Sequence, residues 1–228
     1  MIWLSLAFGS PLSDGVAAFE AGDLPRAVQV MEPRVHQGWA SGALKYDLGN
    51  AYYRKGDLPR AIAYWRAAGQ LMPRSSAVNH NLALARDDLE RVPSPAGAPS
   101  FWMRILTPGE LGLVGTFFVF LGSALLVARA RRREGSRLPG VGFGLFGWLL
   151  GIIAVLGWWE QARMPLAVVV DGPATLRDSP SLESSTRDAI APGAELAVVR
   201  EVGGFLLVET GDGERGWLVD GAVLRVPR

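Results

Sequence analysis

The hexapeptide Gly-Asp-Leu-Pro-Arg-Ala occurs twice in the chain, at residues 22–27 and 56–61, and the two copies start 34 residues apart. Glycine readily adopts the left-handed conformation that ends a helix, aspartate caps the next helix, and proline fits its first turn. The repeated turn therefore predicts a helix–turn–helix unit that is present twice. Units of about this length stack side by side, because one helical pair cannot bury its apolar face alone.

The second unit, residues 42–75, resembles the tetratricopeptide repeat. Gly49 and Ala61 are small where the two helices of such a repeat cross closely, and Tyr52 and Trp65 are expected to fill the space beside the crossing. This resemblance implies that the hexapeptide is a structural turn rather than an active loop.

The first copy matches the repeat less well, because Met31 stands where an aromatic residue is expected. Residues 76–92 are in register with the repeat and predict one more first-type helix without a second helix, which would cap the array. We therefore expect an all-α repeat domain over residues 1–92.

The resemblance implies a partner-binding face on the first helices of the repeats. In the second repeat, Tyr46, Asn50 and Tyr53 follow the i, i+4, i+7 spacing of one helix face. Asn50 matches a position that some family members use to clamp a peptide carboxylate, whereas Tyr46 stands where they carry a basic residue. An ordinary solvated helix face is the alternative. The predicted face comprises Phe19, Tyr46, Asn50, Tyr53, Arg54, His80 and Asp87.

A linker rich in proline, alanine, glycine and serine, residues 93–100, leads to an apolar segment at 101–163. Within it, residues 111–128 and 138–159 contain no charged side chain. Each stretch is long enough to cross a hydrocarbon core of about 30 Å as a helix. We expect two transmembrane helices; a buried helix pair in a soluble fold is the alternative. Indole rings prefer the membrane interface, and tryptophans lie near the ends at Trp102, Trp158 and Trp159.

The loop between the two apolar stretches is strongly basic, with five arginines and one glutamate. Short basic loops stay on the cytoplasmic side of a membrane. We therefore expect a hairpin whose loop is cytoplasmic and whose outer ends both face away from the cytoplasm. A nucleic-acid site is disfavoured for so short a loop, and the net charge of the chain is only +1. The arginines are Arg129, Arg131, Arg132, Arg133 and Arg137.

Residues 142–147, GFGLFG, match the glycine pattern of dinucleotide-binding sites. That pattern requires a preceding strand and a βαβ unit, whereas here it lies inside an apolar stretch. We interpret Gly140, Gly144, Gly147 and Gly151 of this stretch as positions at which two helices approach closely.

Residues 164–228 contain five short runs of strand-forming residues separated by tight turns such as Gly203-Gly204, and they predict a small all-β barrel. The segment resembles bacterial SH3-like domains, most clearly at residues 174–181 and 216–219. Members of that family bind cell-wall peptides or other proteins. Phe205 and Trp217 are the surface candidates, although Trp217 fits a core position equally well.

The sequence offers little catalytic chemistry. It has no cysteine, and its two histidines, His36 and His80, belong to different repeats. The P-loop, Gly-x-Ser-x-Gly and His-Glu-x-x-His motifs are missing. We expect a protein that is not an enzyme and that binds no metal or cofactor.

The whole domain order resembles BatE-type proteins of bacterial aerotolerance operons: an all-α tetratricopeptide-repeat solenoid, a two-helix transmembrane hairpin and a small all-β SH3-like barrel. The resemblance implies an inner-membrane scaffold with both terminal domains in the periplasm, and partners among Bat proteins that carry von Willebrand A domains. The alternative function is an envelope anchor or sensor that binds peptidoglycan through the SH3-like domain.

The start of the chain bears on this location. Residues 1–10, MIWLSLAFGS, have a short apolar run without a basic segment before it. A complete secretory signal has both features. We expect the segment to be the remnant of a longer signal peptide; a cytoplasmic repeat domain is the rival interpretation.

Overall fold

The computed structural model describes residues 11–37, 40–89, 107–132, 138–163 and 166–226. They form two compact units, one from residues within 1–98 and 165–228 and the other from residues within 99–164. Several expectations lie outside the described residues or side chains: the start of the chain at 1–10, the linker at 93–100, Trp102, Trp158, Trp159, Arg131, Arg132, Arg133 and Arg137.

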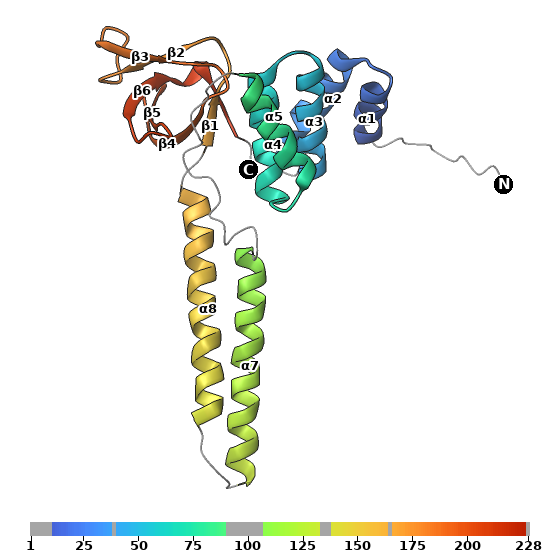
Figure 1. The fold of residues 1–228 in the computed structure, drawn as a ribbon, viewed down its shortest axis with the longest axis vertical. Helices are drawn as coiled ribbons and strands as arrows, with labels where there is room; N and C mark the ends of the chain where they lie inside the picture. Colours follow the sequence, from blue (N-terminus) through green and yellow to red (C-terminus); the bar gives the residue numbers. More distant parts are fainter. Residues whose placement is uncertain (1–10, 38–39, 90–106, 133–137, 164–165, 227–228) are drawn as a thin grey trace, which may run out of the picture. The chain divides into compact units, whose positions relative to one another are not determined.

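In the first unit, the repeated turns separate helices as the hexapeptide predicts (Figure 1). Asp57 caps its helix by accepting a hydrogen bond from the Arg60 N–H at 3.1 Å. Gly22 and Gly56 have φ of +81° and +80°, so both copies of the hexapeptide start with a left-handed glycine. The helices are α1 Pro11–Glu20, α2 Leu24–His36, α3 Gly42–Arg54, α4 Leu58–Leu71 and α5 Ser76–Asp88.

Helices α3 and α4 cross as closely as the sequence predicts. A Cβ atom placed on Gly49 would lie 2.5 Å from Cδ1 of Trp65, so the indole packs directly on the glycine backbone. Trp65 is fully buried, together with Leu48 and Ala61. Met31 is also fully buried and lies against Gly15, the equivalent small residue of the first copy. The first copy therefore packs in the same way with a methionine in place of the indole.

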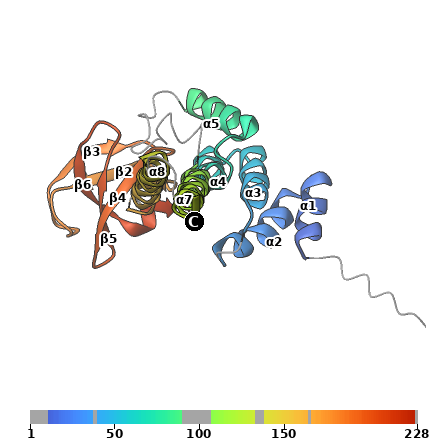
Figure 2. The same cartoon turned by 90° about the horizontal axis from the view of Figure 1, so that it is seen from below.

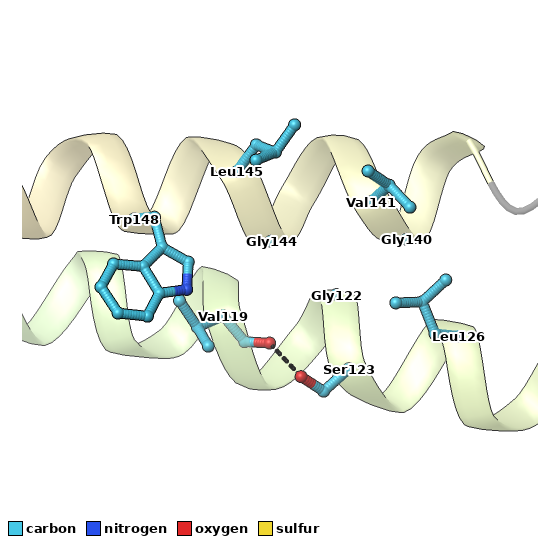
Figure 3. Close-up of a pocket in the computed structure, with 9 residues that line it drawn as sticks. All are labelled: Val119, Gly122, Ser123, Leu126, Gly140, Val141, Gly144, Leu145 and Trp148. Carbon is cyan, nitrogen blue, oxygen red and sulfur yellow. Dashed lines mark hydrogen bonds between the residues drawn. The ribbon is translucent and has the colours of Figure 1, made fainter.

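The second unit is a pair of long apolar helices, α7 Pro108–Arg132 and α8 Leu138–Arg163, which lie side by side (Figures 1 and 2). Both have the length and hydropathy of candidate membrane spans. Glycines allow the backbones to meet, since a Cβ atom on Gly122 would lie 2.6 Å from the Gly144 nitrogen. Figure 3 shows the hollow beside this crossing, where the Ser123 hydroxyl donates to the Val119 carbonyl within α7 at 2.8 Å.

The C-terminal region is an antiparallel sheet of seven strands in the order β3-β2-β6-β5-β4-β1-β7. The expected number of five is too low, because β2 lies within the 174–181 segment and β3 follows it, and neither was among the five predicted runs. One core includes residues of β1, β2, β4, β5, β6 and β7, so the sheet must curl around it. The strands are β1 Leu166–Val169, β2 Ala174–Arg177, β3 Thr186–Ile190, β4 Glu195–Val202, β5 Phe205–Glu209, β6 Arg215–Val219 and β7 Val223–Arg225.

Strand β1 is buried on both faces and belongs to two cores. Ala167 and Val169 point into the core of the sheet, whereas Leu166 and Val168 join the core formed by the helices. Val226 also belongs to the helical core. The helices and the sheet are therefore one compact unit, although the apolar hairpin separates them in the chain.

An ionic cluster adds to this junction. The carboxylate of Glu195, which is only 3% exposed, pairs with Arg66 of α4 and with Arg86 of α5. The Arg86 Nε–H donates to Glu195 Oε1 at 3.0 Å. Two arginines from separate helices thus share one buried carboxylate at the first residue of β4.

Candidate functional site

A chain of hydrogen bonds links helices α3, α4 and α5 on the predicted face. Indole Nε1–H of Trp65 can only donate, so the atom of Asn50 that lies 3.1 Å away must be Oδ1. Asn81 then presents its Nδ2 to that same oxygen, at 3.2 Å. The second Nδ2 proton of Asn81 goes to the Tyr46 hydroxyl oxygen, also at 3.2 Å.

This arrangement fixes which groups remain available for a ligand. Among the described residues, the Nδ2 group of Asn50 keeps both protons, the Tyr46 hydroxyl keeps its own, and Asn81 keeps its carbonyl oxygen as an acceptor. All three side chains are half-buried. The centre of the face therefore offers several hydrogen-bond donors on side chains whose orientation is already fixed.

Apolar surface and one cation flank this network. The Tyr53 ring packs at 5.5 Å between centroids on Trp65 and is 36% exposed. The Arg54 guanidinium lies 4.8 Å from the centroid of the Phe19 ring, and its Nη1 donates to the Phe19 carbonyl at 3.1 Å. Phe19 and Arg54 therefore link α1 to α3 on the same side of the array.

On α5, the predicted residues His80 and Asp87 are exposed. Leu84 lies between them on the same helix face and is 41% exposed, but it was not among the predicted residues. Sequence reasoning could have found it, because 80, 84 and 87 repeat the spacing of 46, 50 and 53 after a shift of one period. Asn81 was also missed, since its role depends on a contact between two repeats.

A second polar cluster lies between α2, α3 and α4. Glu32 Oε1 accepts hydrogen bonds from the hydroxyls of Tyr52 at 2.7 Å and Tyr64 at 2.6 Å. His36 Nε2 lies 3.3 Å from the Tyr64 oxygen, whose proton is already donated to Glu32. Burial and the Glu32 carboxylate both raise the pKa of the two tyrosines well above the ordinary value. These phenols are held neutral, which suits a structural role.

On the sheet, the two aromatic candidates lie on the outer face. Leu206 and Leu218 point into the core, so their neighbours Phe205 and Trp217 point away from it. Both are half-buried and lie diagonally across β5 and β6. Trp217 is thus a surface residue rather than a core residue. No group of three or more His, Asp or Glu side chains that could hold a metal occurs within the described part of the chain.

Comparison with protein families gives one match. The profile of the tetratricopeptide repeat covers residues 42–75. Residues 42–75 form a tetratricopeptide repeat. Its boundaries coincide with α3, α4 and the turn before α5, so this repeat carries Tyr46, Asn50, Tyr53 and Arg54. A search of curated proteins found no match.

Proposed function

We propose that the chain is a non-catalytic membrane scaffold that binds a protein partner on the face formed by α1, α3 and α5. The network of Trp65, Asn50, Asn81 and Tyr46 carries the proposal, since it holds donors ready on a face that also exposes Tyr53 and Leu84. Tetratricopeptide repeats bind proteins in general, which agrees with this role.

The chemistry of the face favours an extended polypeptide. Main-chain carbonyl groups of such a segment would accept hydrogen bonds from Asn50 Nδ2 and from the Tyr46 hydroxyl. Apolar side chains of the segment would pack on Tyr53 and Leu84, which are exposed on either side. Because the side chains are already oriented, binding would cost little ordering entropy.

The apolar helices supply the membrane anchor in this proposal. Residues within 1–98 and 165–228 fold into one compact unit, so they must lie on the same side of any membrane. The segment between them must then cross an even number of times, which fits a hairpin of α7 and α8. By the positive-inside rule, the arginine-rich loop favours a cytoplasmic turn of the hairpin, which would leave the folded unit in the periplasm.

The domain order fits a BatE-type protein of the bacterial inner membrane, with a C-terminal sheet of the SH3-like kind. Its partners would then be Bat proteins with von Willebrand A domains. The alternative, an envelope anchor that binds peptidoglycan, would use the outer face of the sheet at Phe205 and Trp217.

Site-specific photocrosslinking in cells tests the proposal. A benzophenone amino acid at Tyr53 should crosslink to a protein partner, while the same group at Leu182, which is 70% exposed in the β2–β3 loop, should not. The Leu84→Asp substitution should abolish the Tyr53 crosslink. Equal crosslinking from both positions, or a crosslink that survives Leu84→Asp, would refute binding on this face.

A binding experiment with purified peptidoglycan tests the alternative function. The full chain, solubilised in detergent, is incubated with purified peptidoglycan, with a Trp217→Ser variant as the control. If peptidoglycan retains the wild-type protein but not the Trp217→Ser variant, and the Tyr53 crosslink is missing, the cell-wall anchor is favoured.

A further inference from the structure

The hollow beside the crossing of α7 and α8 has space for a side chain that the two helices do not supply (Figure 3). Its volume is about 230 Å³. An apolar cavity of about 150 Å³ is large enough to hold benzene. Gly144 lines the hollow, and nothing lies within 4 Å of a Cβ atom placed on this residue. The hollow therefore has room for an aromatic side chain from another chain.

A hydrogen-bond donor lies at the edge of this hollow, in the middle of the candidate membrane span. Trp148 lies halfway along the span Gly140–Gly157 and is 67% exposed. An indole nitrogen can only donate, and among the described residues none accepts its proton. Tryptophans in membrane proteins are enriched at the interface, where the polar end of the ring meets headgroups and water. Trp148 is therefore at an unusual depth for its side chain.

Lipid supplies no acceptor at this depth. A helix rises 1.5 Å per residue, so Trp148 lies about 12–14 Å along α8 from either end of the span. If α8 spans a bilayer, as the proposed function requires, hydrocarbon surrounds the exposed indole. Hydrocarbon accepts no hydrogen bond, and an unpaired polar group is unfavourable there. The indole of Trp148 therefore requires an acceptor on another transmembrane segment.

The same surface offers an acceptor in return. Ser123 lines the hollow from α7, is exposed, and donates its hydroxyl proton to the Val119 carbonyl at 2.8 Å. Its oxygen keeps lone pairs that can accept a hydrogen bond. One face thus carries the space for an aromatic ring, an exposed indole and an acceptor oxygen. Two copies that turn this face toward each other satisfy both donors, because a twofold pair makes every contact twice.

We infer that two copies of the chain pair in the membrane through this hollow: Trp148 of each copy lies over the hollow of the other and donates to its Ser123 hydroxyl. The inference rests on the proposed membrane hairpin. A second copy is favoured over a helix of another protein, because the donor, the acceptor and the space for the donor all lie on one face of this chain. Small residues such as Gly144 let membrane helices approach closely enough for such a bond.

Energy transfer between copies of the full chain tests the inference. The sequence has no cysteine, so a single label can be attached to a cysteine introduced at Asp212, an exposed residue of the β5–β6 turn. Donor-labelled and acceptor-labelled proteins are reconstituted together into phosphatidylethanolamine–phosphatidylglycerol vesicles at a series of protein-to-lipid ratios. Resistance to alkaline extraction shows, for the wild type and for each variant, that the chain is inserted in the bilayer.

Two leucine substitutions separate the hollow from the rest of α8. Gly144→Leu fills the hollow without displacing α7, because its Cβ atom points into open space. Energy transfer should fall to the level of randomly placed monomers. Gly142→Leu is the matched control, since nothing lies within 4 Å of a Cβ atom there either, and Gly142 does not line the hollow. This variant should associate as strongly as the wild type.

Two conservative substitutions test the hydrogen bond. Trp148→Phe and Ser123→Ala should each weaken association by about 3- to 10-fold, the effect of losing one hydrogen bond between membrane helices. The double variant should associate no more weakly than Trp148→Phe alone, because both changes remove the same bond. Thr116→Val is the control and should leave association unchanged: Thr116 also donates to a carbonyl four residues earlier in α7, but it lies outside the hollow.

Each alternative outcome is distinct. Random-level energy transfer in a wild type that resists alkaline extraction would overturn the pairing and leave the hairpin intact; a hollow filled by another protein's helix gives this result. Equal association of the two leucine variants would overturn the hollow as the contact. Wild-type association of Trp148→Phe would overturn the role of the indole. Extraction of the wild type by alkali would overturn both this inference and the membrane hairpin.

Discussion

Glu195, at the first position of β4, pairs through its carboxylate with Arg66 in α4, although the entire segment 99–164 lies between these residues in the chain. The Glu195 side chain is 1% exposed and that of Arg66 is 11% exposed. An ion pair so far from water stabilises a fold only when both partners are present. The ion pair forms only when the sheet packs against α4, so the effect of breaking it measures how much this packing contributes to stability.

Glu195→Gln should lower the free energy of unfolding by about 3–5 kcal/mol, because it leaves the largely buried charge of Arg66 uncompensated and removes the charge that pairs with the half-buried Arg86. Urea unfolding of the full chain in detergent, followed by tryptophan fluorescence, measures the loss. Glu201→Gln is the matched control: that side chain is 54% exposed, so removing its charge should leave the free energy of unfolding almost unchanged. Equal losses for the two variants would contradict the role assigned to Glu195.

Gly49→Ala should destabilise the repeat by about 1–3 kcal/mol, since the new methyl group would overlap the Trp65 ring at 2.5 Å. Gly69 offers a control in the next helix. A Cβ atom there meets Val78 at 3.5 Å, an ordinary contact, so Gly69→Ala should stabilise α4 by about 0.5–1 kcal/mol through helix propensity. Thermal unfolding monitored by circular dichroism at 222 nm compares the two. The same sign for both substitutions would refute the close crossing.

Alkaline pH should destabilise the folded unit through Tyr52 and Tyr64. Their pKa is raised by folding, so above about pH 10 the unfolded chain loses protons that the folded chain keeps, and stability falls. Each tyrosine contributes a slope of up to about 1.4 kcal/mol per pH unit. Tyr64→Phe should reduce this slope between pH 10 and about pH 12. Burial lowers the pKa of Lys45, but that effect is present in both proteins and cancels in the comparison. If stability falls with pH equally steeply in the wild type and in Tyr64→Phe, Tyr64 ionises in the folded state as freely as in the unfolded chain.

Gly147→Ala should weaken the pairing of α7 and α8, because its Cβ atom would lie 2.5 Å from the Gly115 carbonyl oxygen and 2.7 Å from the Val119 nitrogen. Gly142→Ala is the matched change in the same helix, since nothing lies within 4 Å of a Cβ atom there. Disulfide formation between cysteines introduced at Gly112 and Ala154 reports on the pairing in membranes. Reduced crosslinking in both variants, or in neither, would contradict the glycine contact.

Much of the helical array could be predicted from local signals. Asp57 and Gly56 define where α4 starts and α3 ends, and Gly49 with Trp65 defines how the two helices cross. The predicted face at Tyr46, Asn50 and Tyr53 also follows from helical spacing within a single helix. Such features depend on residues near one another in the chain, so a sequence pattern contains them.

Contacts between distant segments could not be predicted in the same way. Nothing around Glu195 in the sequence indicates that its partners lie on α4 and α5. The run at 166–169 predicts a strand, but its uniform apolar character does not say that two different cores share it. Strand β3 was missed because it is exposed along most of its length and lacks an alternating pattern, and β2 was missed because it has only four residues.

Strand β1 also sets an order of events during biosynthesis. Leu166 and Val168 complete the core of helices that are synthesised long before them, and Val226 follows later still. A ribosome must therefore make both apolar helices before the repeat can close its core, so the repeat reaches its final stability only after α7 and α8 have been synthesised. Nascent chains stalled before Leu166 should accordingly expose α4 to protease, whereas released chains that include Val226 should protect it.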